Sequence, residues 1–264
     1  MIPRSFITEW REQAPWATEE YVEQDLVISR ALVELFSNEL LAEHLAFRGG
    51  TALYKLYVRP AARYSEDIDL VQTKQGRTGP MLDALRDSMR WLGDNPKYKS
   101  SESLTAFRYS FESEGSGVPL RLKLEINTRE HFRVLEEQRI EYGVQNRWFS
   151  GFALIPTYPL AELLGTKLRA LYDRSKGRDL FDLWLALQRT DVDPQAIADC
   201  CGKYLKYENR VVRRPEFQRN LEEKLADPSF RLDTDGLLRP EIADAYDVDA
   251  AGALISERLL ALLP

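Results

Sequence analysis

The segment from Leu45 to Gln72 constrains the fold of this chain more than any other part of it. Leu45–Arg48 is a short apolar run that predicts a strand, and the glycine pair Gly49-Gly50 that follows predicts a turn. Thr51–Val58 has the pattern of a helix, and Asp67–Gln72 has that of a second strand. A strand, a glycine turn, a helix and a second strand in close succession favour a mixed α and β domain.

The glycine turn has the composition of a phosphate-binding site. Gly49 and Gly50 carry no side chains, so the backbone at this point can approach a phosphate closely. A helix that begins at Thr51 would direct its free N–H groups at the same phosphate. A glycine pair alone is weak evidence, because such pairs also occur in ordinary turns.

Two aspartates follow on the second predicted strand. Because side chains alternate along a strand, the carboxylates of Asp67 and Asp69 are expected on one face, about 7 Å apart. Ile68 and Leu70 then point into the core. Two converging carboxylates suit Mg²⁺, a hard cation that prefers oxygen ligands. A lone Asp-x-Asp is more often a solvated turn, so the order of glycine turn, helix and aspartate strand carries the prediction.

A downstream hairpin offers a third carboxylate. Leu104–Glu112 and Pro119–Asn127 form a predicted β-hairpin, and the second strand alternates between apolar and polar residues. If this strand is a neighbour of the aspartate strand, Glu125 lies on the same face as the two aspartates and completes a metal site. The alternative is an exposed strand glutamate that pairs with Lys123 or Arg121.

The chain changes character near Tyr158, from mixed α and β patterns to helical ones. We therefore expect an α+β fold class with two domains, a catalytic one over residues 1–157 and a helical one over residues 158–264. Apolar spacing predicts helices over Thr18–Glu43, Met81–Leu92 and Pro159–Asp173, a β segment around Phe152–Pro156, and a helix after Gly177, which can end the helix before it.

Composition excludes several classes of protein. The 264 residues are 44% hydrophobic and 30% charged, which is enough apolar content for one large domain or two small ones and is unlike a disordered chain. The sequence has no apolar run of about 18 residues and no signal-like segment near its start, so we expect a cytoplasmic protein without a membrane span. Cys200 and Cys201 are adjacent, which disfavours a disulfide, and we expect both to pack within a helix.

The net charge of −6 argues against broad, nonspecific coating of nucleic acid but leaves room for a local basic face. The segment Lys203–Arg214 is the candidate, because it has a single acid, Glu208, and two interleaved tyrosines. Its cations are Lys203, Lys206, Arg210, Arg213 and Arg214. A solvated helix face is the ordinary interpretation, and a phosphate-binding patch for an RNA is the sharper one.

Charged residues also interrupt the apolar faces of two predicted helices in the second half. Lys167 borders the leucine stripe of the helix Pro159–Asp173, where the ordinary interpretation is a packed stem with its ammonium in water. Asp182 stands among apolar residues, so it needs a cationic partner or a functional role. Asp179, in the first turn of the same helix, is explained by the helix dipole alone.

Three motifs together resemble one family. Phe47–Leu70 resembles the signature of the AbiEii/AbiGii family of nucleotidyltransferase toxins, which includes the MenT toxins. Glu162–Leu171 resembles a helical motif of that family, and Lys176–Asp182 resembles its fourth motif, Lys-x-Arg-Asp-x-x-Asp. The resemblance covers most of Val22–Trp184. It implies a polymerase-beta-like domain, with a small mixed or antiparallel sheet flanked by helices, followed by a helical domain.

The resemblance also implies a role for each candidate residue. Asp67, Asp69 and Glu125 would hold Mg²⁺ or Mn²⁺, and Gly49, Gly50, Thr51, Arg63 and Ser65 would bind the nucleotide. Lys167 would contact the β- and γ-phosphates, Lys176 and Arg178 would bind phosphate or base, and Asp179 or Asp182 would accept the proton of the attacking hydroxyl or orient Lys167. Arg63 is alternatively an ion-pair partner of Glu66.

Ser65 lies two residues before Asp67, which suggests a control point. A phosphate on Ser65 would add about −1.5 to −2 charge beside the carboxylates and repel a nucleoside triphosphate. Phosphorylation of Ser65 is a hypothesis, and an intact mass without added phosphate after co-expression with a cognate antitoxin would remove it.

The sequence thus predicts a metal-dependent nucleotidyltransferase toxin that moves a nucleoside monophosphate from an NTP to an RNA, the 3′ end of tRNA by resemblance, and that is restrained by an antitoxin protein. Two alternatives stay open. A small-molecule nucleotidyltransferase would share the metal residues and would not need the basic segment. A nucleotide-binding module that interacts with an antitoxin would bind nucleotide without turnover.

Overall fold

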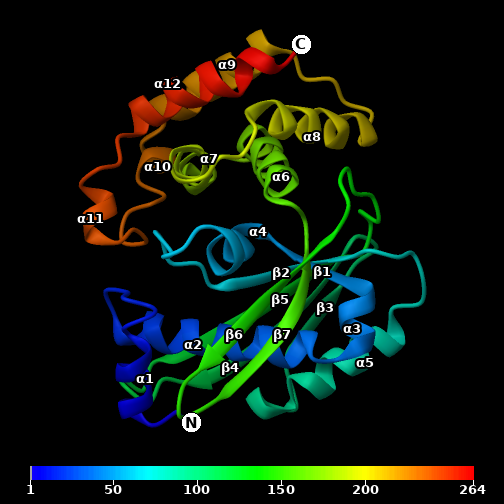
Figure 1. Cartoon of the computed structure of the whole chain (residues 1–264), viewed down its shortest axis with the longest axis vertical. Coiled ribbons are helices and arrows are strands. Elements are labelled where there is room, and N and C mark those ends of the chain that lie inside the picture. The colour runs from blue at the N-terminus through cyan, green and yellow to red at the C-terminus, as the bar shows by residue number, and fades with distance from the viewer. Residues whose placement is uncertain (1) are drawn as a thin grey trace. The chain divides into compact units, whose positions relative to one another are not determined.

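Seven strands form one mixed sheet in the first part of the chain (Figure 1). The computed structural model describes residues 2–264, which divide into two units. The first unit comprises the residues up to Arg133 and Glu137–Tyr158, and the second comprises Val134–Glu136 and Pro159–Pro264. The strands are β1 (Leu45–Arg48), β2 (Asp67–Gln72), β3 (Lys97–Ser100), β4 (Leu104–Glu112), β5 (Pro119–Asn127), β6 (Gln138–Gln145) and β7 (Ser150–Thr157).

The strand order is β3-β4-β5-β2-β1-β7-β6. β2 pairs with β5 and β1 pairs with β7 in parallel, whereas the other neighbours are antiparallel. The predicted strands β1, β2, β4 and β5 have the expected bounds, and the apolar residues Ile68, Leu70, Leu122, Leu124 and Ile126 are buried on one face. The opposite face of β2 and β5 carries their polar residues, as period-two alternation requires.

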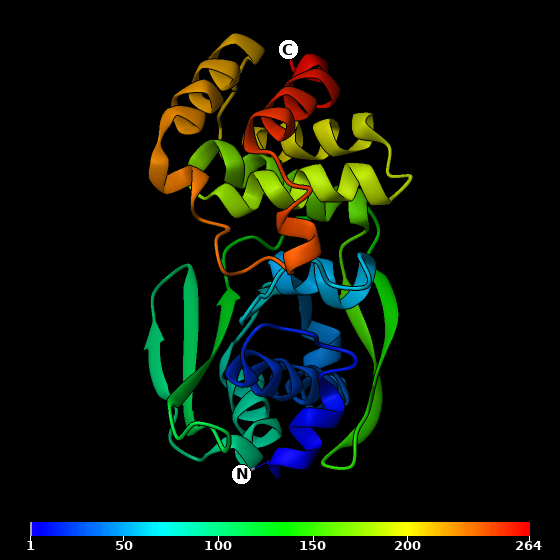
Figure 2. The same ribbon diagram turned by 90° about the vertical axis from the view of Figure 1, so that its left-hand side faces the viewer.

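The helices of the first unit are α1 (Arg4–Trp10), α2 (Glu19–Phe36), α3 (Glu39–His44), α4 (Gly49–Ala52), the π-helix η1 (Leu53–Tyr57), α5 (Gly79–Ser88) and η2 (Arg90–Leu92). The sheet curves so that β3–β4 and β6–β7 lie on either side of α2 (Figure 2). Hydrogen bonds join α2 to both sides, from the Gln24 amide to the Arg121 carbonyl and from the Tyr142 hydroxyl to Ser29.

The single helix predicted over Thr18–Glu43 is wrong, because two helices occupy that range. Thr18 caps α2 as expected, and its hydroxyl accepts a hydrogen bond from the backbone N–H of Tyr21. Asn38 then accepts one from the N–H of Leu41 and starts α3. A side chain that satisfies a free N–H favours a new helix start over continuation of the old helix.

A buried charge cluster anchors η1 to α2. The Asp25 carboxylate of α2 accepts hydrogen bonds from the indole nitrogens of Trp10 and Trp16 and pairs with the Lys55 ammonium of η1 at 2.7 Å. Lys55 also donates to the Ser29 hydroxyl at 2.9 Å. All the polar groups in this cluster have partners, so the cluster positions the segment that follows the glycine turn.

The second unit is helical apart from its loops. Its helices are α6 (Leu160–Asp173), α7 (Gly177–Arg189), α8 (Pro194–Tyr207), α9 (Arg214–Ala226), α10 (Pro228–Arg231), α11 (Pro240–Ala243), α12 (Val248–Arg258) and η3 (Leu260–Leu262). α6 and α8 pack closely, since a Cβ on Gly165 would lie 2.5 Å from the Cβ of Cys200. Both cysteines are free and buried in α8, as expected. No helix within residues 2–264 has the length and apolar character to span a membrane.

Candidate active site

The turn between β1 and α4 packs against the side chain of Asp69. Gly49 has a φ of +82°, a left-handed conformation in which other residues are strained. A Cβ on Gly49 would lie 2.1 Å from Oδ2 of Asp69, and one on Gly50 would lie 2.5 Å from a guanidinium nitrogen of Arg63. Backbone conformation and the packing of Asp69 therefore require glycine at position 49, and Gly50 leaves room for the guanidinium of Arg63, a reason that the sequence alone did not reveal. The helix begins at Gly49 and not at Thr51.

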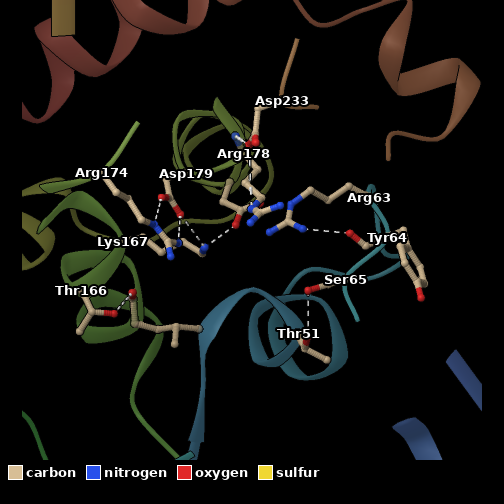
Figure 3. A network of polar contacts seen from close by, with 12 residues as sticks. Thr51, Arg63, Tyr64, Ser65, Thr166, Lys167, Arg174, Arg178, Asp179 and Asp233 are labelled. Carbon is tan, nitrogen blue, oxygen red and sulfur yellow. Dashed lines mark hydrogen bonds and ion pairs between the residues drawn. The ribbon is translucent and has the colours of Figure 1, made fainter. Parts of the chain in front are cut away.

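Thr51 ties α4 to the start of β2. Its buried hydroxyl donates to the backbone carbonyl of Asp67 at 2.5 Å and lies 2.8 Å from the hydroxyl of Ser65 (Figure 3). Arg63 is also buried, donates to the carbonyl of Tyr64 at 2.9 Å, and has its guanidinium carbon 5.1 Å from the centroid of the Tyr54 ring. These contacts hold the glycine turn and the aspartate strand together.

The three predicted carboxylates occupy neighbouring strands. Asp69 of β2 lies directly opposite Glu125 of β5, and Asp67 lies opposite Lys123. The prediction that Glu125 shares a face with the two aspartates required β2 and β5 to be neighbours, and they are paired directly. Arg48 of β1 lies opposite Asp69 on the other side, and its guanidinium pairs with Glu130 at 2.7 Å.

Lys123 supplies a positive charge within this carboxylate row. Its ammonium lies 2.8 Å from a carboxylate oxygen of Glu125, which is the ion pair expected under the alternative interpretation of Glu125. Desolvation by burial raises the pKa of Asp67 to about 6, the charge of Asp69 adds to this, and Lys123 opposes it. Burial of Asp67 and the neighbouring charge of Asp69 therefore both disfavour the ionised form of Asp67.

The chemistry of this row fits a hard divalent cation. Carboxylate oxygens on adjacent strands are the ligands that Mg²⁺ prefers, and burial raises the pKa of Asp67, so a bound cation would favour its ionised form. Within residues 2–264, however, no three acidic, histidine or cysteine side chains are gathered closely enough to hold a metal ion. The Glu125 carboxylate faces Lys123. A metal bound by all three carboxylates would require Glu125 to turn away from that lysine.

The second unit contains a buried cluster around Lys167 (Figure 3). The Lys167 ammonium lies 2.5 Å from a carboxylate oxygen of Asp182 and 3.3 Å from one of Asp179. Both aspartates are fully buried, and Arg174 also donates to Asp179, at 2.7 and 2.9 Å. The ordinary interpretation of Lys167, with its ammonium in water, is wrong, because α7 supplies two carboxylates to that ammonium.

The remaining cations of the fourth motif face Asp233. The Lys176 ammonium and the Arg178 guanidinium lie 3.5 and 3.9 Å from its carboxylate, which also accepts the backbone N–H of Arg178 at 3.1 Å. Gly177 begins α7 and does not end α6, which stops at Asp173. A Cβ on Gly177 would lie 2.1 Å from the carbonyl oxygen of Phe230, so close backbone packing explains this glycine.

The basic segment Lys203–Arg214 is divided between two helices and a loop. Lys203 and Lys206 are exposed on α8, and Arg213 and Arg214 are exposed at the start of α9. Arg210 pairs with Asp173 and with Glu208, at 2.5 and 2.9 Å. Tyr204 is fully buried and donates to the Glu162 carboxylate at 2.7 Å, so it is not an exposed ring among the cations.

The structure adds residues that the sequence analysis did not single out. Arg108 of β4 lies opposite Lys123, and Lys97 of β3 lies opposite Arg108. Arg108 lies within the predicted strand Leu104–Glu112, whose burial alternates in the structure, whereas β3 was not predicted. Arg174 and Asp233 were also missed, because each acts on a residue distant in the chain or across a helix break.

The profile of one protein family matches most of the chain. The family is described as the nucleotidyl transferase AbiEii toxin of a type IV toxin–antitoxin system, and it matches residues 30–253. No curated protein matches the chain.

Several solved structures have the same fold. MenT4, a nucleotidyltransferase toxin from Mycobacterium tuberculosis, is 19% identical with a TM-score of 0.67, over 99% of this chain and 90% of that one. JHP933 from Helicobacter pylori is 17% identical with a TM-score of 0.62, over 93% and 92%. A putative nucleotidyltransferase from H. pylori is 16% identical with a TM-score of 0.59, over 93% and 95%. At these identities the likeness establishes the fold, an α+β arrangement with a mixed sheet flanked by helices.

Proposed function

Because the chain belongs to the AbiEii family of nucleotidyl transferase toxins, we propose that it moves a nucleoside monophosphate from an NTP to the 3′ end of tRNA and so blocks translation. The chain is a nucleotidyltransferase toxin of a type IV toxin–antitoxin system, and its family implies an NTP substrate and an antitoxin partner. The proposal adds the RNA acceptor, the metal, the cytoplasmic location and the roles of individual residues.

The packing of Gly49 against Asp69 carries the assignment of the site. It places the backbone of the glycine turn directly beside the carboxylate row of β2 and β5. Nucleotidyl transfer needs these two features together, because a triphosphate must be held while charge develops at its α-phosphorus. We assign the triphosphate tail to Gly49, Gly50 and Thr51.

Asp67, Asp69 and Glu125 are the residues that would hold Mg²⁺ or Mn²⁺. When bound, the metal neutralises phosphate charge and stabilises the attacking and leaving oxygens. Arg63 supports this site from the protein side, since its buried guanidinium packs against Gly50. Ser65 holds the Thr51 hydroxyl and thereby the turn.

The roles in the second unit rest on the resemblance of its two motifs. Lys167 is assigned to the β- and γ-phosphates, with Lys176 and Arg178 as further phosphate or base contacts. Of the two roles predicted for Asp179 and Asp182, we favour orientation of Lys167, because both carboxylates are fully buried and pair with its ammonium. The contacts of Lys176 and Arg178 with Asp233 would be exchanged for contacts with nucleotide.

In the proposed reaction the terminal hydroxyl oxygen of the acceptor bonds to the α-phosphorus. The bond from that phosphorus to the bridging oxygen breaks, and pyrophosphate and a proton are released. The chain contributes positioning and charge, which carry most of the rate of phosphoryl and nucleotidyl transfer.

Incubation of the purified protein with Mg²⁺, bulk tRNA and each α-labelled NTP in turn tests the proposal. Asp69→Asn is the matched control, because it keeps the side-chain shape beside Gly49 and removes the charge. Label in tRNA with the unaltered protein alone is the expected result. Label in a small molecule instead of RNA would favour a small-molecule transferase, and NTP binding without any product would favour a binding module.

A further inference from the structure

The polar face of the sheet carries two rows of side chains that run outward from the carboxylates. Directly opposed residues of β2, β5, β4 and β3 form the first row, Asp67, Lys123, Arg108 and Lys97. The second row is Asp69, Glu125, Ala106 and Lys99. Both rows begin with acids on β2 and end with lysines on the edge strand. At about 4.8 Å per strand, β3 lies about 14 Å from the aspartates.

The first row contains three cations that lie directly opposite one another on neighbouring strands, Lys123, Arg108 and Lys97. Like charges on directly opposed residues of neighbouring strands destabilise a sheet. Within residues 2–264, the side chains of Lys97, Lys99, Arg108 and Arg121 make no hydrogen bond or ion pair that would offset this repulsion. A chain with a net charge of −6 has many acids that could have served as partners.

Two cavities open on this face and meet at the same cations. One, of about 410 Å³, is lined by Lys97, Lys99, Arg108, Lys123 and Glu125 among others. The other, of about 460 Å³, is lined by the acids Glu66 and Asp67 and by Arg108, Arg121 and Lys123 among others, with Tyr21 and Tyr64 at its wall. Their volumes lie in the range of ligand sites, and each cavity includes a proposed metal ligand.

We propose that this face, Lys97, Lys99, Arg108, Arg121 and Lys123, binds the phosphate backbone of the single-stranded acceptor end and guides its terminal hydroxyl to Asp67 and Asp69. The inference rests on the proposed function. The triphosphate tail is assigned to the glycine turn, on the β1 side of β2, whereas the cations lie on the β5 side. Donor and acceptor would therefore approach the carboxylates from opposite sides, as an in-line transfer requires.

The occupant is a polynucleotide and not the triphosphate, because the cations continue over three strands to the edge of the sheet. A groove with positive charge spread along its length matches the regular charge of a nucleic-acid backbone. The half-buried ring of Tyr21, which stacks on the buried ring of Tyr64 with centroids 3.9 Å apart, offers an aromatic surface for a base in the cavity that includes Asp67.

Lys97→Ala/Arg108→Ala tests the surface by fluorescence anisotropy with labelled tRNA in the absence of NTP. The tRNA affinity should fall at least tenfold at low salt, and the slope of log K against log salt should fall by about 1.4, or about 0.7 for each lost phosphate contact. The affinity for NTP with Mg²⁺ should be unchanged. Lys74→Ala/Arg77→Ala, which removes the same two charges from the loop after β2, should leave the tRNA affinity as it is.

Three results would overturn the inference. One is an unchanged tRNA affinity in Lys97→Ala/Arg108→Ala. Another is loss of NTP binding with intact tRNA binding, which would assign the cations to the triphosphate. The third is loss confined to Lys203→Ala/Lys206→Ala, which would place the acceptor on α8.

The proposed function fails separately. Unaltered protein that binds tRNA through these cations but labels no RNA would overturn the function alone. Unaltered protein that labels tRNA while Lys97→Ala/Arg108→Ala binds and reacts equally well would overturn the surface alone, and protein that neither binds nor labels tRNA would overturn both.

Discussion

Single side chains at the carboxylate row are held by contacts from three strands and one turn. Asp69 lies between Arg48 and Glu125 in the sheet and against Gly49 in the turn. Glu125 pairs with Lys123 and also lies opposite Asp69. The ion pair with Lys123 and a place in the metal site are therefore both compatible with the position of this side chain. A substitution at any of these positions therefore acts on its neighbours as well as on itself.

Gly49→Ala should lower the rate of nucleotide transfer on the order of 100-fold, and this loss can be separated from any loss of stability. The left-handed φ costs about 1–2 kcal/mol for alanine, and the new Cβ would also displace the Asp69 carboxylate. Displacement of a metal ligand by about 1 Å costs on the order of 100-fold in rate.

Gly117→Ala is the matched control, because Gly117 has a φ of +68° in open space. It should lose similar stability in urea unfolding and keep its transfer rate. Equal activity of the two variants would contradict the role given to Gly49.

At the scale of elements, helices α6 and α7 depend on each other through buried charge. The Lys167 ammonium of α6 is enclosed by two carboxylates of α7. α9 supplies a further contact, because the Lys224 ammonium donates to the backbone carbonyls of Leu171 and Tyr172 in the last turn of α6. These contacts satisfy free carbonyls at the end of the helix, but burial of the ammonium outweighs them and disfavours its charged form.

Lys224 should make stability depend on pH. Desolvation lowers its pKa to about 8, partly offset by Asp173 and Asp179. Between about pH 8 and the unfolded value near 10.4, the unfolded chain keeps a proton that the folded chain has released, so stability rises with pH. Urea unfolding should show a gain on the order of 2 kcal/mol over this range relative to Lys224→Met. Parallel pH profiles of the two proteins would refute this assignment.

At the scale of the whole molecule, an acidic chain gathers excess charge of both signs on one sheet face. The acids Asp67, Asp69 and Glu125 lie together on β2 and β5, and Lys123 pairs with Glu125. Within the described residues 2–264, Lys97 and Arg108 of β3 and β4 face other cations and make no ion pair. In the proposed function a metal ion neutralises the carboxylates of β2 and β5, and an RNA backbone neutralises the cations of β3 and β4. Stability should therefore respond to both ligands.

Mg²⁺ at 100 times its Kd should stabilise the folded chain by about 2.7 kcal/mol, because it binds the folded state alone. Asp69→Asn should show almost none of this gain, which urea unfolding with and without Mg²⁺ measures. The same gain in both proteins would mean that Mg²⁺ binds elsewhere.

The sequence by itself determined the local elements and the family. A hairpin pattern with an alternating second strand located β4 and β5, the glycine pair located the turn after β1, and the motifs identified a nucleotidyltransferase toxin. β3 and β6 were not predicted. β3 is exposed throughout, so it shows no alternation of buried and exposed residues.

Only the tertiary structure decided which side chains meet. Parallel pairing of β2 with β5 set Asp69 opposite Glu125, and the edge position of β3 aligned Lys97 with Arg108. The packing of α6 with α7 converted Lys167 from a surface lysine into a buried ion pair. The physical reason is that periodicity is a property of neighbours along the chain, whereas register and helix packing join residues that are distant in it.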